Sequence, residues 1–157
     1  MSAPRLFSTH FPRTLLPPYV TSCKLNYICR DPKDVLVSKW FFMNKIRDKD
    51  LPPLSFDEAF ALFCQGISDF GPIWEHVLSY WRASLDAPDK ILFLKYEEVK
   101  QQPEDGVFKF GKEEVGNREF FRKGKIGDWQ NYMTEEMKER IDGIIHEKLK
   151  GSRVDTW

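Results

Sequence analysis

The stretch Lys24-Leu25-Asn26-Tyr27-Ile28-Cys29-Arg30-Asp31-Pro32 decides the fold class. Its first six residues are mostly apolar and predict a short buried strand. Asp31 followed by Pro32 is typical of a helix start, because an aspartate side chain accepts bonds from free backbone N–H groups and proline fits the first helical turn. Apolar residues then recur at spacings of three and four, which predicts a helix that ends before Pro52-Pro53.

A second apolar strand is predicted at Ile91-Leu92-Phe93-Leu94. Between the two strands, Ser55-Phe56-Asp57-Glu58 has the S-x-x-E pattern of a capping box, and a further helix is predicted from Ile73 to Ala83. Two buried strands separated by helices favour a parallel sheet and therefore the α/β class.

Three further segments, the two ends of the chain and a glycine-rich part, lack the strand pattern. Prolines break the segment from 4 to 19 into loop or short extended pieces, and five glycines between 101 and 127 predict a loop. A final amphipathic helix is predicted from Thr134 to Lys150.

Composition excludes several function classes. The chain has 157 residues, a length that suggests one domain, with 24 Lys+Arg balanced by 24 Asp+Glu, so no nucleic-acid partner is expected. No apolar run approaches the roughly 20 residues that cross a bilayer, and the first residues lack a secretory signal, so we expect no membrane partner and a cytoplasmic location. Three cysteines without CxxC spacing and three scattered histidines predict no metal site.

Anion binding is the chemistry that the predicted strand-to-helix junction favours. Backbone N–H groups are free where a helix begins, so Arg30 to Asp34 lies where an α/β sheet binds an anion. Arg30 offers a planar fork to an oxyanion, and Ser38 adds a hydroxyl. The alternative is that Arg30 pairs with a carboxylate such as Asp34 and that Ser38 faces a neighbouring residue.

Three further candidates stand elsewhere in the chain. Arg122-Lys123-Gly124 combines two cations with a glycine that permits close backbone approach, although it can equally be solvated surface. His10 lies in a proline-bound segment and is suited to proton transfer, or it is structural. Tyr96 follows the second strand, at the same sheet edge as Arg30, where its ring could flank a base or pack in the core.

Taken together, these motifs resemble the cytosolic sulfotransferases, in particular the plant branch. The resemblance is carried by four segments in the family's order: Pro4 to Pro12, Tyr27 through Ser38, Leu94-Lys95-Tyr96-Glu97-Glu98, and Phe120 to Trp129, which contains the specific R-K-G-x-x-G-D-W motif. It implies a parallel-sheet, P-loop-type sulfotransferase fold across nearly the whole chain.

The resemblance also implies a reaction and a role for each candidate residue. The family transfers a sulfuryl group from 3′-phosphoadenylyl sulfate (PAPS) to a hydroxyl of a small acceptor, without a metal. His10 matches the catalytic base, and Tyr96 matches a residue at the adenine. The positions that match ligands of the 3′-phosphate are Arg30, Ser38, Arg122, Lys123 and Gly124.

The sequence departs from the family pattern in three places. No K-S-G-T-T-W-type phosphosulfate loop precedes His10, and the chain between Tyr96 and Arg122 is shorter than the family usually runs. We therefore expect residues 1–157 to form a partial sulfotransferase domain with an incomplete fold. The family's dimer motif, K-x-x-x-T-V-x-x-x-E, has lost its lysine and valine here, so homodimerisation by that motif is not expected.

The resulting hypothesis is a PAPS-dependent sulfotransferase acting on a small plant-type hydroxylated metabolite, such as a flavonoid or a steroid. The alternative is a catalytically inactive sulfotransferase remnant that at most binds a 3′-phosphoadenosine nucleotide or a protein partner. The acceptor itself is not identified by the sequence.

Overall fold

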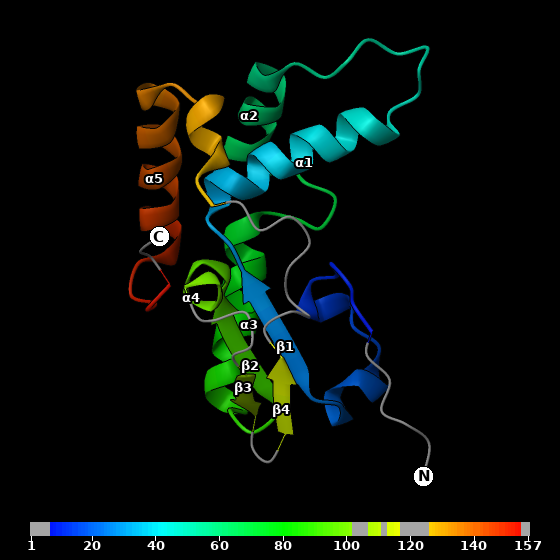
Figure 1. Ribbon diagram of the computed structural model, residues 1–157, viewed down its shortest axis with the longest axis vertical. Coiled ribbons are helices and arrows are strands. Elements are labelled where there is room, and N and C mark those ends of the chain that lie inside the picture. Colours follow the sequence, from blue (N-terminus) through cyan, green and yellow to red (C-terminus); the bar gives the residue numbers. More distant parts are fainter. Residues whose placement is uncertain (1–6, 102–106, 111–112, 117–125, 155–157) are drawn as a thin grey trace.

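A computed structural model describes residues 7–101, 107–110, 113–116 and 126–154 of the chain. Two parallel strands, β1 (Leu25–Cys29) and β2 (Ile91–Lys95), form its central sheet, with Leu25 opposite Ile91 and Cys29 opposite Lys95. Both arrows point toward the beginning of helix α1 in Figure 1. The predicted parallel sheet and α/β class are confirmed.

The helices begin where their sequence signals predict. Helix α1 (Pro32–Ile46) is capped by the Asp31 carboxylate, which accepts a bond from the backbone N of Lys33 at 2.9 Å. Helix α2 (Phe56–Cys64) has the complete capping box of Ser55 and Glu58, and Thr134 caps α5 (Glu135–Leu149). Side-chain caps satisfy backbone donors that have no partner in the first turn, which fixes where each helix starts.

The remaining helices are α3 (Ile73–Asp86) and the short α4 (Tyr96–Lys100), which follows β2 directly. Helix α3 lies against the sheet, while α1, α2 and α5 gather beyond the carboxyl ends of the strands (Figure 1). The sheet and these helices share one apolar core. Helix α5 contributes Ile141 and Leu149 to this core, both almost fully buried, and β1 contributes Cys29.

One prediction about an irregular segment needs correction. Between 101 and 127, where a loop is predicted, β3 (Val107–Phe110) pairs antiparallel with β4 (Glu113–Gly116). The two segments are only two residues apart and rich in valine and phenylalanine, so local pairing of extended chain prevails over the glycine content. Near the start of the chain, where loop or short extended pieces are predicted, short 3₁₀ turns lie at Arg13–Leu15 and Pro18–Ser22.

Lys33 ties the beginning of α1 to the distant helix α5. It is only 6% exposed, and its ammonium group contacts the carboxylates of Asp142 on α5 and Asp31, the latter at 3.3 Å. Its Nζ also lies 5.3 Å from the centre of the Trp129 ring. A buried charge is tolerated only when it is paired, so these contacts fix the position of α5 against α1.

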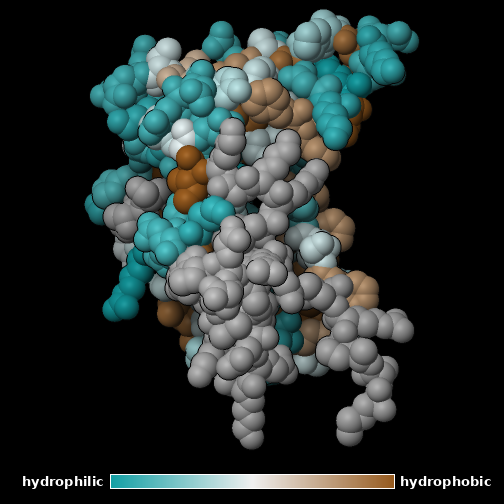
Figure 2. Space-filling model, in the orientation of Figure 1, coloured by the Kyte–Doolittle hydropathy of each residue, from teal (hydrophilic) through white to brown (hydrophobic). Residues whose placement is uncertain are grey.

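The surface mixes polar and apolar residues in the upper part of the view in Figure 2. The second half of α1 exposes three large apolar side chains, with Phe41, Phe42 and Ile46 between 47% and 58% exposed.

Candidate functional site

Arg30 and Tyr96 meet at the carboxyl edge of the parallel sheet. Because Cys29 and Lys95 are opposite each other, the residues that follow them emerge side by side. The guanidinium carbon of Arg30 lies 5.0 Å from the centre of the Tyr96 ring, and that ring is largely buried. The sequence correctly predicted a shared edge, and the tertiary structure adds a cation–π contact between the two side chains.

Asp34, in the first turn of α1, organises this edge. Its fully buried carboxylate accepts a bond from Nη2 of Arg30 at 3.1 Å. The same oxygen, Oδ2, accepts from the backbone N of Gly127 at 2.9 Å, and Oδ1 accepts from the backbone N of Trp129 at 3.1 Å. The ion pair between Arg30 and Asp34 is therefore present, as one part of the alternative interpretation expects, and Asp34 also holds a segment far away in sequence.

The turn at Gly127 requires a glycine. Its φ is +79°, in the left-handed region, which a residue with a Cβ atom adopts only with strain. This backbone conformation lets the N–H groups of Gly127 and Trp129 both face Asp34.

Glu97, in helix α4, also makes contacts at this edge of the sheet. Its Oε1 accepts a bond from the backbone N of Asp31 at 2.9 Å, which links the end of β2 to the start of α1. Its Oε2 is buried without a hydrogen-bond partner among the described residues. Burial raises the pKa of the Glu97 carboxyl, and burial likewise raises that of Asp31.

His10 is exposed, and its backbone is held from two sides. Its carbonyl oxygen lies 3.2 Å from Nε2 of His76, and the carbonyl of the next residue, Phe11, accepts a bond from the Tyr80 hydroxyl at 2.9 Å. The imidazole of His10 stacks on the ring of Phe70, with centroids 6.3 Å apart and planes 14° apart. The proline-bound segment thus presents an accessible imidazole from an anchored backbone.

The backbone of His10 is held by a second histidine, His76, which the sequence did not indicate as a candidate. His76 on α3 has Nδ1 at 2.9 Å from the Tyr27 hydroxyl. A carbonyl can only accept, so Nε2 of His76 carries the proton and Nδ1 accepts from Tyr27. Burial is the main cause that lowers the pKa of His76, which favours this neutral form.

Ser38 lies one helical turn after Asp34, on the same side of α1, and is exposed. Its hydroxyl is therefore within one turn of the carboxylate that holds Arg30. Arg122, Lys123 and Gly124 lie outside the described residues.

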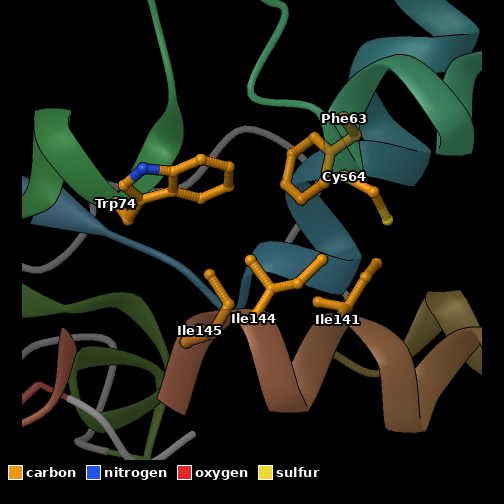
Figure 3. Close-up of a pocket in the computed structure, with 6 residues that line it drawn as sticks. All are labelled: Phe63, Cys64, Trp74, Ile141, Ile144 and Ile145. Atoms are coloured by element: carbon orange, nitrogen blue, oxygen red, sulfur yellow. The ribbon is translucent and has the colours of Figure 1, made fainter. Parts of the chain in front are cut away.

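Two of the three cysteines, Cys29 and Cys64, lie in apolar surroundings. Burial raises the pKa of the Cys29 thiol to about 12, far above the range in which a thiolate acts as a nucleophile. Cys64 lines a small apolar crevice between α2, α3 and α5, where Phe63 and Trp74 face three isoleucines of α5 (Figure 3). That crevice is too narrow to admit a water molecule and belongs to the core packing.

The described residues contain neither a membrane-spanning helix nor a cluster of metal-binding side chains. None of their helices has the length and apolar character needed to span a bilayer. Within the same residues, no group of three or more histidine, cysteine or acidic side chains converges in the way that would hold a metal ion.

Comparisons of this chain with known proteins all match the same family. A sulfotransferase domain model matches residues 1–112 and 108–153. Cytosolic sulfotransferase 5 of Arabidopsis thaliana is 41% identical over 193 aligned positions, which cover 96% of this chain and 60% of that protein. Cytosolic sulfotransferase 17 of the same plant is 42% identical, with 94% of this chain and 56% of the relative covered.

Solved structures of sulfotransferases are also similar to this chain in fold. A putative steroid sulphotransferase of Arabidopsis thaliana superimposes with a TM-score of 0.73 at 35% identity, covering 100% of this chain and 56% of that chain. Mouse sulfotransferase SULT7A1, solved in complex with PAP, has a TM-score of 0.69 at 26% identity and covers 93% and 66%.

The chain spans about 60% of the length of the curated relatives named above. The 193 aligned positions also exceed the 157 residues of the chain, so the relatives carry residues within the matched range that this chain lacks. The two matched segments of the domain model meet near β3 and β4, in the part where the sequence is shorter than the family pattern. On the match of the domain model and the identity to these relatives, this chain belongs to the sulfotransferase family.

Proposed function

We propose that this chain binds a 3′-phosphoadenosine nucleotide at the carboxyl edge of β1 and β2 and transfers the sulfuryl group of PAPS to a hydroxyl of a small acceptor. The observation that carries the proposal is the arrangement of Arg30, Asp34 and Tyr96 at that edge. The site suits a phosphorylated nucleotide because it combines a fixed guanidinium with an aromatic ring. No metal takes part in this proposal.

Each residue has a defined part in nucleotide binding. Arg30 and the exposed hydroxyl of Ser38 bind the 3′-phosphate, because Arg30 lies just before the start of α1 and Ser38 lies in its second turn, at the helix end whose dipole favours an anion. Tyr96 supports the adenine side of the site. Arg122, Lys123 and Gly124 complete the phosphate contacts in this proposal, since Gly124 is only three residues before Gly127, a length that spans at most about 10 Å.

His10 acts as the base on the acceptor. It removes the proton of the acceptor hydroxyl while the oxygen forms a bond to sulfur, the bond from sulfur to the 5′-phosphate oxygen of PAPS breaks, and PAP leaves. An exposed imidazole on an anchored backbone suits this role, because the acceptor must reach the ring. The exposed rings of Phe11 and Phe70 beside His10 favour a flat, hydrophobic acceptor such as a flavonoid or a steroid.

The names of the relatives support the same proposal and a cytosolic location for this chain. PAP in the mouse structure supports the choice of nucleotide. The alternative of a non-catalytic nucleotide-binding chain keeps the same edge of the sheet but needs no function for His10.

Calorimetric titration of the 157-residue chain with PAP tests the binding step, after circular dichroism has shown that the chain is folded. Micromolar affinity is the expected result, and a folded chain that does not bind PAP would overturn the proposal. A subsequent assay with PAPS and phenolic or steroidal acceptors separates the enzyme from the binding-only alternative, because only the enzyme releases PAP in an acceptor-dependent manner.

A further inference from the structure

Asp34 joins two parts of the nucleotide site that are distant in sequence. Nη2 of Arg30 and the backbone N of Gly127 both lie within 3.1 Å of the same carboxylate oxygen. The other oxygen holds the backbone N of Trp129, two residues further along. One side chain therefore contacts a residue that follows β1 and the turn that follows the Arg122-Lys123-Gly124 segment.

We propose that Asp34 is a positioning residue that holds Arg30 and the turn at residues 127–129 in the one arrangement that binds a 3′-phosphate. The inference rests on the proposed function and adds to it a residue that need not contact the nucleotide. Its basis is a set of three bonds to one buried carboxylate.

The energetics favour a fixed arrangement. The Asp34 side chain has no exposed surface, so its charge requires compensation. An ionised carboxylate strengthens each bond that it accepts, and both backbone donors and the guanidinium contribute here. Movement of the 127–129 turn away from α1 would break two of these bonds. The buried charge of Asp34 would then be less well compensated, so such movement is unfavourable.

The geometry also orients the arginine. A guanidinium is planar and has five N–H donors, so a bond from Nη2 to Asp34 fixes the direction of the fork. The Tyr96 ring, whose centre lies 5.0 Å from the guanidinium carbon, restricts rotation of that plane. An arginine that is fixed before binding loses less side-chain entropy when the phosphate arrives.

Asparagine at this position would be a near-isosteric but insufficient substitute. It has one carbonyl oxygen and an NH₂ group that donates, so it cannot accept from Arg30, Gly127 and Trp129 in the manner of a carboxylate. We therefore expect Asp34→Asn to weaken the contact with Arg30 and to release at least one of the two backbone donors.

The test compares two nucleotides that differ only in the 3′-phosphate. The affinities of PAP and adenosine 5′-phosphate are measured by calorimetry for the wild type and for Asp34→Asn. We expect the variant to bind PAP 10- to 100-fold more weakly and adenosine 5′-phosphate with unchanged affinity. An unchanged ratio of the two affinities would overturn the inference, and no PAP binding by the folded wild type would overturn the proposed function together with it.

Asp142→Asn is the matched control. Asp142 pairs with Lys33 in the same first turn of α1, so its replacement also breaks an ion pair there, whereas the hydrogen bonds to Arg30 and to the 127–129 turn come from Asp34. We expect this control to leave the ratio of affinities unchanged. A fall in the ratio for both variants would assign the effect to general loosening of α1 and would overturn the positioning role.

Amide proton shifts supply a readout independent of nucleotide binding. The ¹⁵N-resolved amide signal of Gly127 should move upfield in Asp34→Asn and stay in place in Asp142→Asn. If Asp34→Asn does not fold, Asp34→Glu keeps the charge but is one methylene longer. The longer side chain should displace Arg30 and lower the affinity for PAP several-fold. Unchanged PAP affinity in Asp34→Glu would overturn the inference.

Discussion

The Tyr27 hydroxyl on β1 donates a hydrogen bond to Nδ1 of His76 on α3 over 2.9 Å, and the opposite ring nitrogen of His76 reaches the backbone of His10. The Tyr27 ring also stacks on Tyr80, whose hydroxyl holds the neighbouring carbonyl of Phe11. The candidate base is therefore connected through two side chains of α3 to the same strand, β1, that Arg30 follows. One strand thus supports both the candidate phosphate site and the segment that carries the candidate base.

Replacement of Tyr27 by phenylalanine should destabilise the fold. The change removes only the hydroxyl and leaves Nδ1 of His76 without its donor, and a largely buried polar group left unpaired costs about 1–3 kcal/mol. Urea denaturation measures the free energy of unfolding. Tyr19→Phe, at an exposed tyrosine, is the control, and equal losses for both variants would contradict this account.

Stability should fall as the pH is lowered through about 6.5. Burial lowers the pKa of His76 in the folded chain below its ordinary value of 6.5, so the unfolded chain binds more protons in that window. The free energy of unfolding therefore rises with pH across the window and loses this contribution below it. His76→Gln should flatten the curve measured from pH 5 to 8, and a curve with the same slope in both proteins would exclude His76 as the cause.

Replacement of His10 by alanine should abolish turnover and leave nucleotide affinity intact. The exposed imidazole is the proposed base, whose loss typically lowers the rate about 10²- to 10⁴-fold. The bond from His76 to residue 10 uses the backbone carbonyl, so alanine keeps it. Acceptor-dependent PAP release and PAP titration measure the two effects. His146→Ala, on the exposed face of α5, should change neither, and joint loss of turnover and PAP affinity in His10→Ala would indicate a structural role.

Replacement of Ser38 by alanine should weaken PAP without weakening the fold. A hydrogen bond to a charged phosphate contributes about 1.5–3 kcal/mol, and an exposed hydroxyl contributes little to stability. Calorimetry with PAP and with adenosine 5′-phosphate should show a loss for PAP alone. The control is Ser22→Ala at another exposed serine, and PAP affinity equal to wild type in Ser38→Ala would remove Ser38 from the site.

Replacement of Ile141 by alanine tests the packing of α5. Its side chain is 1% exposed and lies in the core with residues of α2 and α3, so truncation should cost about 2–5 kcal/mol. Ile144→Ala, at a partly exposed position one turn on, should cost less. Urea denaturation compares them, and an equal or smaller loss at Ile141 would contradict the packing of α5 described above.

Local signals in the sequence were sufficient for most of the secondary structure. The two strands, the caps at Asp31 and Ser55 and the final helix are confirmed because each depends on neighbouring residues alone: apolar runs, short polar side chains and helical spacing. The antiparallel pair β3 and β4 was not predicted, because the glycines around it favour a loop and its apolar runs are too short to show strand periodicity.

By itself, the sequence determined the α/β class, the shared edge of Arg30 and Tyr96 and, through its motifs, the sulfotransferase family. Only the tertiary structure decided which groups hold these residues. Asp34 contacts Gly127 and Trp129 across more than 90 residues of chain, and His76 contacts Tyr27 across 49 and the backbone of His10 across 66. Such contacts leave no periodic or local signal, because they arise when packing buries a carboxylate or an imidazole and the nearest available donors and acceptors, however distant in sequence, must satisfy it.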